Sequence, residues 1–134
     1  MAEQRIPAGP GNLNPKSETR KFLAGGIIVA NTFVAFGTTG YSAIECTAIL
    51  QPIGIAQEAA VAGDWFDVVV GGYAPSLTNN GTDVVAGDLL YASTNVYALP
   101  LAASVATTVG APGAIAIQAD TSTTCTGVMV CKRI

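Results

Sequence analysis

The side chains in this sequence that could do chemistry are carboxylates, thiols and hydroxyls, because the chain has no histidine. Activation of a serine or cysteine nucleophile by an imidazole is therefore impossible. Acid–base catalysis needs two carboxyl groups in one cleft. Asp64 and Asp67 are close in the sequence, but residues three apart on a strand point to opposite faces. We expect them to act as a turn cap and a rim charge, and we expect no enzyme activity.

The three cysteines, Cys46, Cys125 and Cys131, form no C-x-x-C pair, and without histidine the common zinc ligand sets are incomplete. In one straight strand Cys125 and Cys131 would lie roughly 20 Å apart, too far for a disulfide. We therefore expect three buried, reduced thiols. The acidic residues follow no calcium-loop spacing, and no phosphate-loop motif occurs. The sequence thus predicts no metal and no cofactor.

The one tryptophan, Trp65, stands beside Phe66 and allows two interpretations. It could stack on a sugar ring, or it could pack in the core beside Val68 and Val70. Aromatic residues make up only 7% of the chain and are scattered, whereas a glycan-binding surface gathers several of them. Core packing is therefore the expectation.

The composition indicates one domain whose surface is shared with other subunits. A chain of 134 residues can bury one core. Half of its residues are hydrophobic and 11% are charged, less than half of the usual quarter. A free monomer needs more surface charge to stay apart from its own copies. We expect much of the folded surface to be covered by other subunits.

The charges divide the chain into an acidic body and two basic ends. The basic residues are Arg5, Lys16, Arg20, Lys21, Lys132 and Arg133. Between Phe22 and Cys131 there is no Lys or Arg, and seven acids occur. This distribution argues against nucleic-acid binding, because the body would repel phosphate. The basic ends are either solvated tails or segments that dock onto acidic neighbouring surfaces.

Residues 1–21 predict an extended N-terminal arm, because their prolines and glycines oppose helix and strand. They contain no apolar run typical of a secretory signal, and the apolar stretch after them is too short and too broken to cross a bilayer. We expect no membrane segment. The arm offers apolar anchors and basic groups for charge-assisted contacts to a partner. The predicted partner-binding residues are Arg5, Ile6, Leu13, Lys16, Arg20, Lys21 and Phe22.

Residues 22–134 predict a single β domain, a compact β-sandwich or small β-barrel, because short apolar runs alternate with turn signals. The expected strands are 26–30, 33–36, 43–49, 53–57, 65–70, 89–92, 114–119 and 127–131, and one helical turn is allowed within 56–62. Gly71-Gly72 is expected to mark a bulge or strand end. The sequence Val-Ala-Gly-Asp occurs at 61–64 and again at 85–88. We expect Gly63, Asp64, Gly87 and Asp88 to form two equivalent structural turns, with glycine supplying the turn dihedral and Asp accepting backbone N–H bonds.

An ordered set of motifs resembles the small capsid decoration, or cement, proteins of tailed phages and prophages. It consists of Ile53-Gly-Ile-Ala56, Ala62-Gly-Asp64, Val68-Val-Val-Gly-Gly72 and Val85-Ala-Gly-Asp-Leu-Leu-Tyr-Ala-Ser93, with a looser likeness at 110–117. The arm is longer than is typical of that family. The resemblance implies a compact, usually trimeric β protein on the outer capsid surface of a virion, made in the host cytoplasm. Its partner would be the major capsid protein.

The function predicted from this resemblance is structural: the protein would bridge capsomers and stabilise the shell. The alternative is a receptor- or glycan-binding β module of a phage fibre or tail. The scattered aromatic residues favour the first interpretation.

Overall fold

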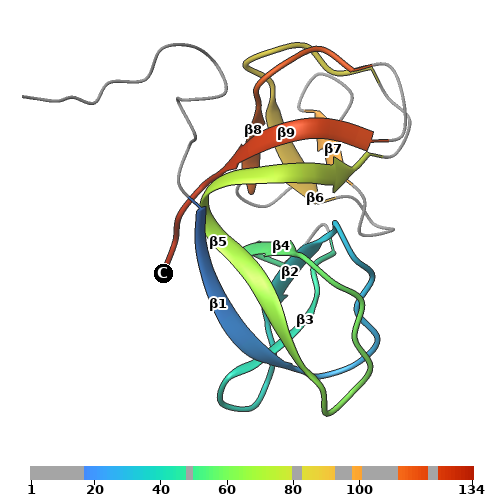
Figure 1. Ribbon diagram of the computed structural model, residues 1–134, viewed down its shortest axis with the longest axis vertical. Coiled ribbons are helices and arrows are strands. Elements are labelled where there is room, and N and C mark those ends of the chain that lie inside the picture. Colours follow the sequence, from blue (N-terminus) through green and yellow to red (C-terminus); the bar gives the residue numbers. More distant parts are fainter. Residues whose placement is uncertain (1–16, 48–49, 80–82, 93–97, 101–111, 121–123) are drawn as a thin grey trace, which may run out of the picture.

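The computed structural model describes residues 17–47, 50–79, 83–92, 98–100, 112–120 and 124–134. These residues form strands and turns without a helix (Figure 1), which confirms the all-β expectation. The strands are β1 Ser17–Ala24, β2 Phe33–Phe36, β3 Ser42–Glu45, β4 Gly54–Ala56, β5 Trp65–Thr78, β6 Leu89–Ala92, β7 Ala98–Pro100, β8 Ala114–Ala116 and β9 Thr124–Val130. No helix in this part of the chain is long and apolar enough to cross a membrane.

Five strands close into a small barrel. β1 pairs in parallel with β3 and antiparallel with β5, and the ring is completed through β2 and β4. Closure removes the exposed edges that an open sheet of this size would present. The interior is filled by aromatic and β-branched side chains from facing strands, including the directly opposed Phe22 and Phe66. The small barrel proposed from sequence is therefore present, with five strands.

Strand β5 is long enough to serve two parts of the molecule (Figure 1). Its first half pairs with β1 and β4, and its second half pairs with β9 from Gly72 onward. Gly72 lies opposite both Ser17 and Val130 and has a φ of 78°. We call the second half of β5 with β6, β7, β8 and β9 the upper sheet. Of the two features expected at Gly71-Gly72, the bulge is present beside Gly71, because Gly71 pairs with Glu18 and Val69 with Thr19, which leaves Val70 without a partner in β1. The strand does not end there, because β9 replaces β1 as the partner and pairing continues.

The upper sheet packs against the outer wall of the barrel, and the two parts share a core cluster. Phe33, Ile55 and Val69 belong to the same core cluster as Leu90 and other inner residues of the upper sheet. The backbone at Gly113 comes so close to the Phe33 ring that a Cβ there would lie 2.5 Å from a ring carbon. Only glycine fits such an approach without displacement.

The repeated Val-Ala-Gly-Asp segments form equivalent corners, one in the barrel and one in the upper sheet. Gly63 and Gly87 have φ values of 94° and 92°. The Asp64 carboxylate accepts a hydrogen bond from the Val61 backbone N–H at 3.2 Å, and the Asp88 carboxylate accepts one from the Val85 N–H at 3.0 Å. In both corners glycine adopts the positive φ of the turn and aspartate accepts the backbone N–H of the residue three positions earlier.

Sequence reasoning overlooked a third corner, at Val29-Ala-Asn-Thr32. Asn31, with a φ of 63°, occupies the position that Gly63 occupies in the corner at residues 61–64. The Thr32 hydroxyl donates to the Val29 carbonyl at 2.7 Å. An isolated antiparallel β-bridge between Ile28 and Ala60 joins the segments that precede the corners at residues 29–32 and 61–64. The signal was the parallel between V-A-N-T and V-A-G-D, in which asparagine replaces glycine as a residue that tolerates the left-handed region.

Three local expectations are wrong. Segment 26–30 is not a strand but holds a single bridge at Ile28, and 56–62 forms bends and a turn instead of a helical turn. Trp65 is 55% exposed, because it faces outward beside Leu23 at the rim of the barrel while Phe66 takes the inner position. Successive residues of a strand point to opposite faces.

Candidate docking surface

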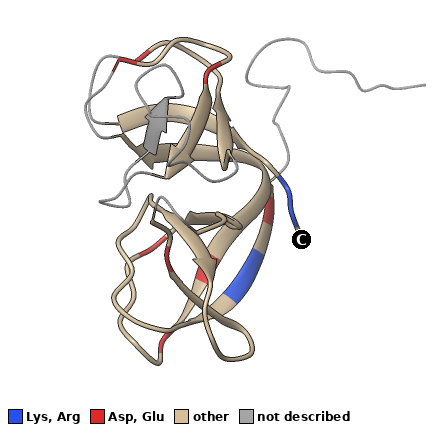
Figure 2. Cartoon of the chain, turned by 180° about the vertical axis from the view of Figure 1, so that it is seen from behind, with Lys and Arg blue, Asp and Glu red and all other residues tan. Residues whose placement is uncertain are grey.

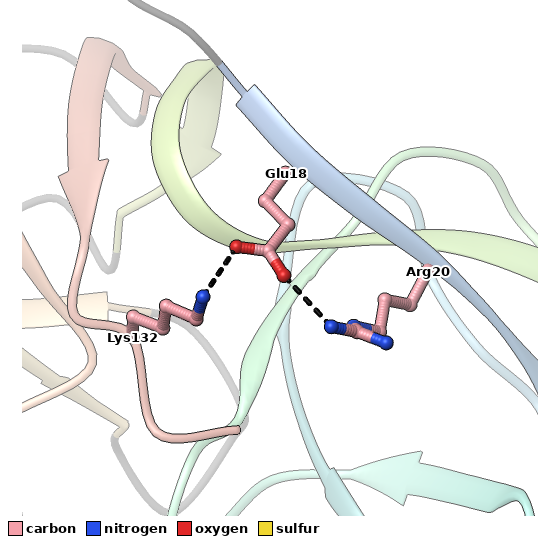
Figure 3. Close-up of polar contacts among 3 residues, drawn as sticks. All are labelled: Glu18, Arg20 and Lys132. Carbon is pink, nitrogen blue, oxygen red and sulfur yellow. Dashed lines mark hydrogen bonds and ion pairs between the residues drawn. The ribbon is translucent and has the colours of Figure 1, made fainter.

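The start of β1 meets the C-terminal tail in a small charged cluster (Figure 3). The Glu18 carboxylate lies 2.9 Å from the Arg20 guanidinium and 2.7 Å from the Lys132 ammonium. Hydrogen bonds from Lys132 and then Arg20 hold the pKa of Glu18 below its ordinary value. Both partners are exposed, so this cluster orients the tail beside β1 more than it stabilises the fold.

Further along β1, the Lys21 ammonium lies 2.9 Å from the Asp67 carboxylate of β5. This hydrogen bond raises the pKa of Lys21. The two residues are directly opposite in the β1–β5 ladder, where opposite charges support the pairing. The basic residues of the described chain thus gather on β1 and on the tail (Figure 2).

These contacts correct the predicted arm. Residues 17–21 are not extended arm but the first part of β1, because they form ladder pairs with β5. Phe22 is 6% exposed and fills the barrel core, so it is not an anchor for a partner. Arg20 and Lys21 form ion pairs within their own chain. The other predicted partner-binding residues, Arg5, Ile6, Leu13 and Lys16, lie outside the described residues.

An apolar pocket of about 350 Å³ lies between the barrel and the tail. Its walls are Ala35, Phe36, Leu50, Ile53 and Ile134, and Gln51 and Arg133 stand at its polar side. The Arg133 guanidinium donates to the Cys131 carbonyl at 3.5 Å, and within the part of the chain that the structure describes it has no carboxylate partner. A pocket with apolar walls and one cation suits an aliphatic group next to a carboxylate.

Exposed apolar side chains occur on both parts of the molecule. On the barrel they are Ile27, Val29, Val61, Trp65, Phe36 and Tyr41; on the upper sheet they are Val85, Ile115, Ile117 and Met129. Ile27 and Tyr41 are 70% and 79% exposed. In the upper sheet Ile115 stands directly opposite Met129. Exposed apolar groups mark a site of association where they are contiguous, as in this pair. The alternation pattern alone did not reveal which of these residues face outward.

Two further carboxylates hold backbone groups in place. Asp120 accepts a hydrogen bond from the Thr126 N–H at 2.9 Å, and Glu58 accepts one from the Asp67 N–H at 3.1 Å. Among the residues that the structure describes, no three Cys, Asp or Glu side chains gather in a group that could hold a metal.

The thiols differ from the expectation at one position. Cys46 and Cys125 are buried and Cys131 is half-buried, and all three are free. Burial raises the pKa of Cys46 to about 12 and that of Cys125 to about 11. Cys131 follows the last residue of β9, where the chain leaves the core.

No family model and no curated protein matches this sequence. A solved structure with a similar fold is the N base of the head fibre gp8.5 of bacteriophage phi29, with a TM-score of 0.60. The two sequences are 16% identical over 87% of this chain and 95% of that chain. The likeness covers most of both chains, so most of this chain follows a fold found in a phage head fibre base.

Proposed function

We propose that this chain is a non-enzymatic structural protein of a phage particle, which decorates and cements the outer surface of the capsid. The observation that carries the proposal is the fold, shared with the base of a phage head fibre over most of both chains. The motif resemblance within residues 53–93 points independently to proteins of the phage head. Both likenesses support the proposed placement on the virion surface.

The surface of the domain supports an assembled state. Charged residues are scarce, and exposed apolar side chains occur on the barrel and on the upper sheet. We propose that copies associate as a homotrimer and that each copy also contacts the major capsid protein. Closed symmetry would cover apolar surface on every copy equally.

Stabilisation of a shell needs no chemistry. A protein that binds only the assembled capsid stabilises that state by mass action, and many equivalent copies add their effects through multivalent attachment. If each trimer spans a joint between capsomers, the joint cannot open without breaking these contacts.

A second candidate function is supported by the same comparison. The similar structure is the base of a fibre, so this domain could be the base of a receptor- or glycan-binding appendage on the virion. The exposed Trp65 and Tyr41 are aromatic side chains that could stack on sugar rings.

Shells that lack the protein provide the test. Purified protein is added to them, and its position is determined by cryo-electron microscopy while DNA release is followed during heating. The cement function predicts density over joints between capsomers and a higher release temperature in decorated particles. Equal release temperatures would reject cementing, and isolated density at scattered vertices together with glycan-array binding would support the appendage.

The attachment mode can be tested with a truncated chain. Deleting residues 1–16 leaves β1 and the barrel intact, so we expect a folded protein with weakened attachment to shells. The matched control is Gly26→Ala, which adds a methyl group where no atom lies within 4 Å and does not shorten the chain. Full decoration by the truncated protein would place attachment on the body of the domain.

A further inference from the structure

The pocket between the barrel and the tail has a composition that matches part of this chain's own N-terminal segment, residues 1–16. Its walls are aliphatic and aromatic, and Arg133 is its cation. Glu3 is the one acid of residues 1–16, and Ile6 is an apolar residue three positions later. In an extended chain these residues are about 10 Å apart. Ile6 can therefore supply the aliphatic group inside the pocket while Glu3 supplies the carboxylate at its side.

The volume suits such an occupant. The pocket measures about 350 Å³, whereas an apolar cavity of about 150 Å³ already holds a benzene ring. There is room for the isoleucine side chain and part of the flanking backbone. The guanidinium of Arg133 keeps donors available for a carboxylate, because the contact to the Cys131 carbonyl uses one nitrogen and a guanidinium has five N–H donors.

The direction of the chain argues that the occupant comes from a second copy. Ser17 and Val130 both lie opposite Gly72. β1 and β9 are both antiparallel to β5, so they run in the same direction. The N-terminal end of β1 therefore points opposite to the direction in which the tail leaves β9 and continues to the pocket.

The reach of the segment fits a neighbouring copy. Ser17 follows Ile6 by eleven positions, which allows a span of about 36–40 Å when extended. That length is enough for the segment to reach a subunit that packs directly against its own. The lack of basic residues from Phe22 to Cys131 also means that Arg133 is one of few cations that a neighbour's carboxylate can meet.

We propose that the Glu3–Ile6 segment of one copy docks in the pocket of a second copy, with Ile6 between the apolar walls and Glu3 paired with Arg133. Each copy then gives a segment and receives one, and the arrangement closes into a ring. The inference rests on the proposed function only in requiring several copies side by side.

Disulfide trapping tests the exchange directly. Two differently tagged full-length chains are prepared without the half-buried thiol by Cys131→Ser, one with Ile6→Cys and the other with Gln51→Cys. After mixing and mild oxidation, we expect a disulfide between the two tags. The control pair replaces Gln51→Cys with Val85→Cys, an exposed position on the upper sheet, and should not link.

Other outcomes of the trapping experiment overturn the proposal. A disulfide that forms only within one chain carrying both new cysteines would place the segment in its own pocket. No disulfide in either format would show that the pocket and the segment do not meet.

Charge reversal gives a second readout that does not depend on cysteine chemistry. Arg133→Glu and Glu3→Lys should each weaken self-association about two- to five-fold, measured by sedimentation equilibrium, and the double variant should restore it. Ile6→Asp should weaken self-association at least ten-fold, since a buried aliphatic side chain contributes about 1.5–3 kcal/mol. Unchanged association in all four variants would refute the docking.

The two proposals fail in different ways. Shells decorated normally by protein that never cross-links would overturn the segment exchange and leave the capsid function in place. Cross-linked oligomers that bind no shell would overturn the capsid function and leave the segment exchange in place.

Discussion

Replacing Gly113 by alanine tests whether the barrel and the upper sheet unfold as one unit. The added Cβ would lie 2.5–2.9 Å from three atoms of the Phe33 ring, and the ring is fully buried. The backbone cannot retreat freely, because the Gly113 N–H donates to Leu90 and its carbonyl accepts from Cys131, each at 2.9 Å. Overpacking of this kind costs about 1–3 kcal/mol. Each 1 kcal/mol lowers the unfolding midpoint by about 2–8 °C in domains of this order of size.

The assay is thermal and urea unfolding followed by tryptophan fluorescence and far-ultraviolet circular dichroism. Gly26→Ala is the matched control, because a Cβ there meets no atom within 4 Å, and it should change stability by less than about 0.5 kcal/mol. We expect Gly113→Ala to lower the midpoint in one transition that both probes report together. Equal midpoints for the two variants, or a loss confined to one probe, would refute the shared core.

Three further outcomes follow from the structure. Gly63→Ala should destabilise the fold by about 1–2 kcal/mol in urea titrations, because an L side chain is strained at positive φ, whereas the same change at a glycine of negative φ in open space should not. Burial raises the pKa of Cys46 to about 12 and that of Cys125 to about 11. At pH 8 the half-buried Cys131 should therefore be alkylated first in the folded protein, and all three thiols should react after unfolding without reductant. Detection of a disulfide by mass spectrometry would contradict this. Hydrogen bonds lower the pKa of Glu18 in the folded protein. The contribution of Glu18 to stability is therefore present above pH 4.5 and is lost as the pH falls through the lower pKa of the folded state. In an NMR titration Lys132→Ala should raise the pKa of Glu18, and an unchanged pKa would show that the pair does not form in solution.

Strands with strong local signals were predictable from sequence. The predicted segments 33–36 and 89–92 coincide with β2 and β6, because each is a short apolar run between turn residues. The turn glycines were predictable for a similar reason: Gly63 and Gly87 adopt positive φ, which glycine accepts without steric cost. β1 was missed because polar residues and neighbouring prolines resemble a linker, and only the opposing β5 makes it a strand.

Contacts between distant segments could not be read from the sequence. The pairing of Lys132 with Glu18 and the pocket formed by the tail with β2 and the residues before β4 join positions far apart in the chain. The outward orientation of Trp65 likewise depends on its register with Leu23, and a shift of one residue would exchange the inner and outer faces.

The sequence by itself determined that this protein is all-β, poor in charge, acidic in its body and without the histidine that many catalytic sites need. Composition and local turn chemistry are sufficient for those conclusions, because they act within a few residues. The tertiary structure decided that five strands close into a barrel, that β5 passes from the barrel to the upper sheet at Gly72, and that an apolar pocket opens beside Arg133. Those features depend on strand register and on packing between segments far apart in the chain, and such contacts form only when the whole domain folds.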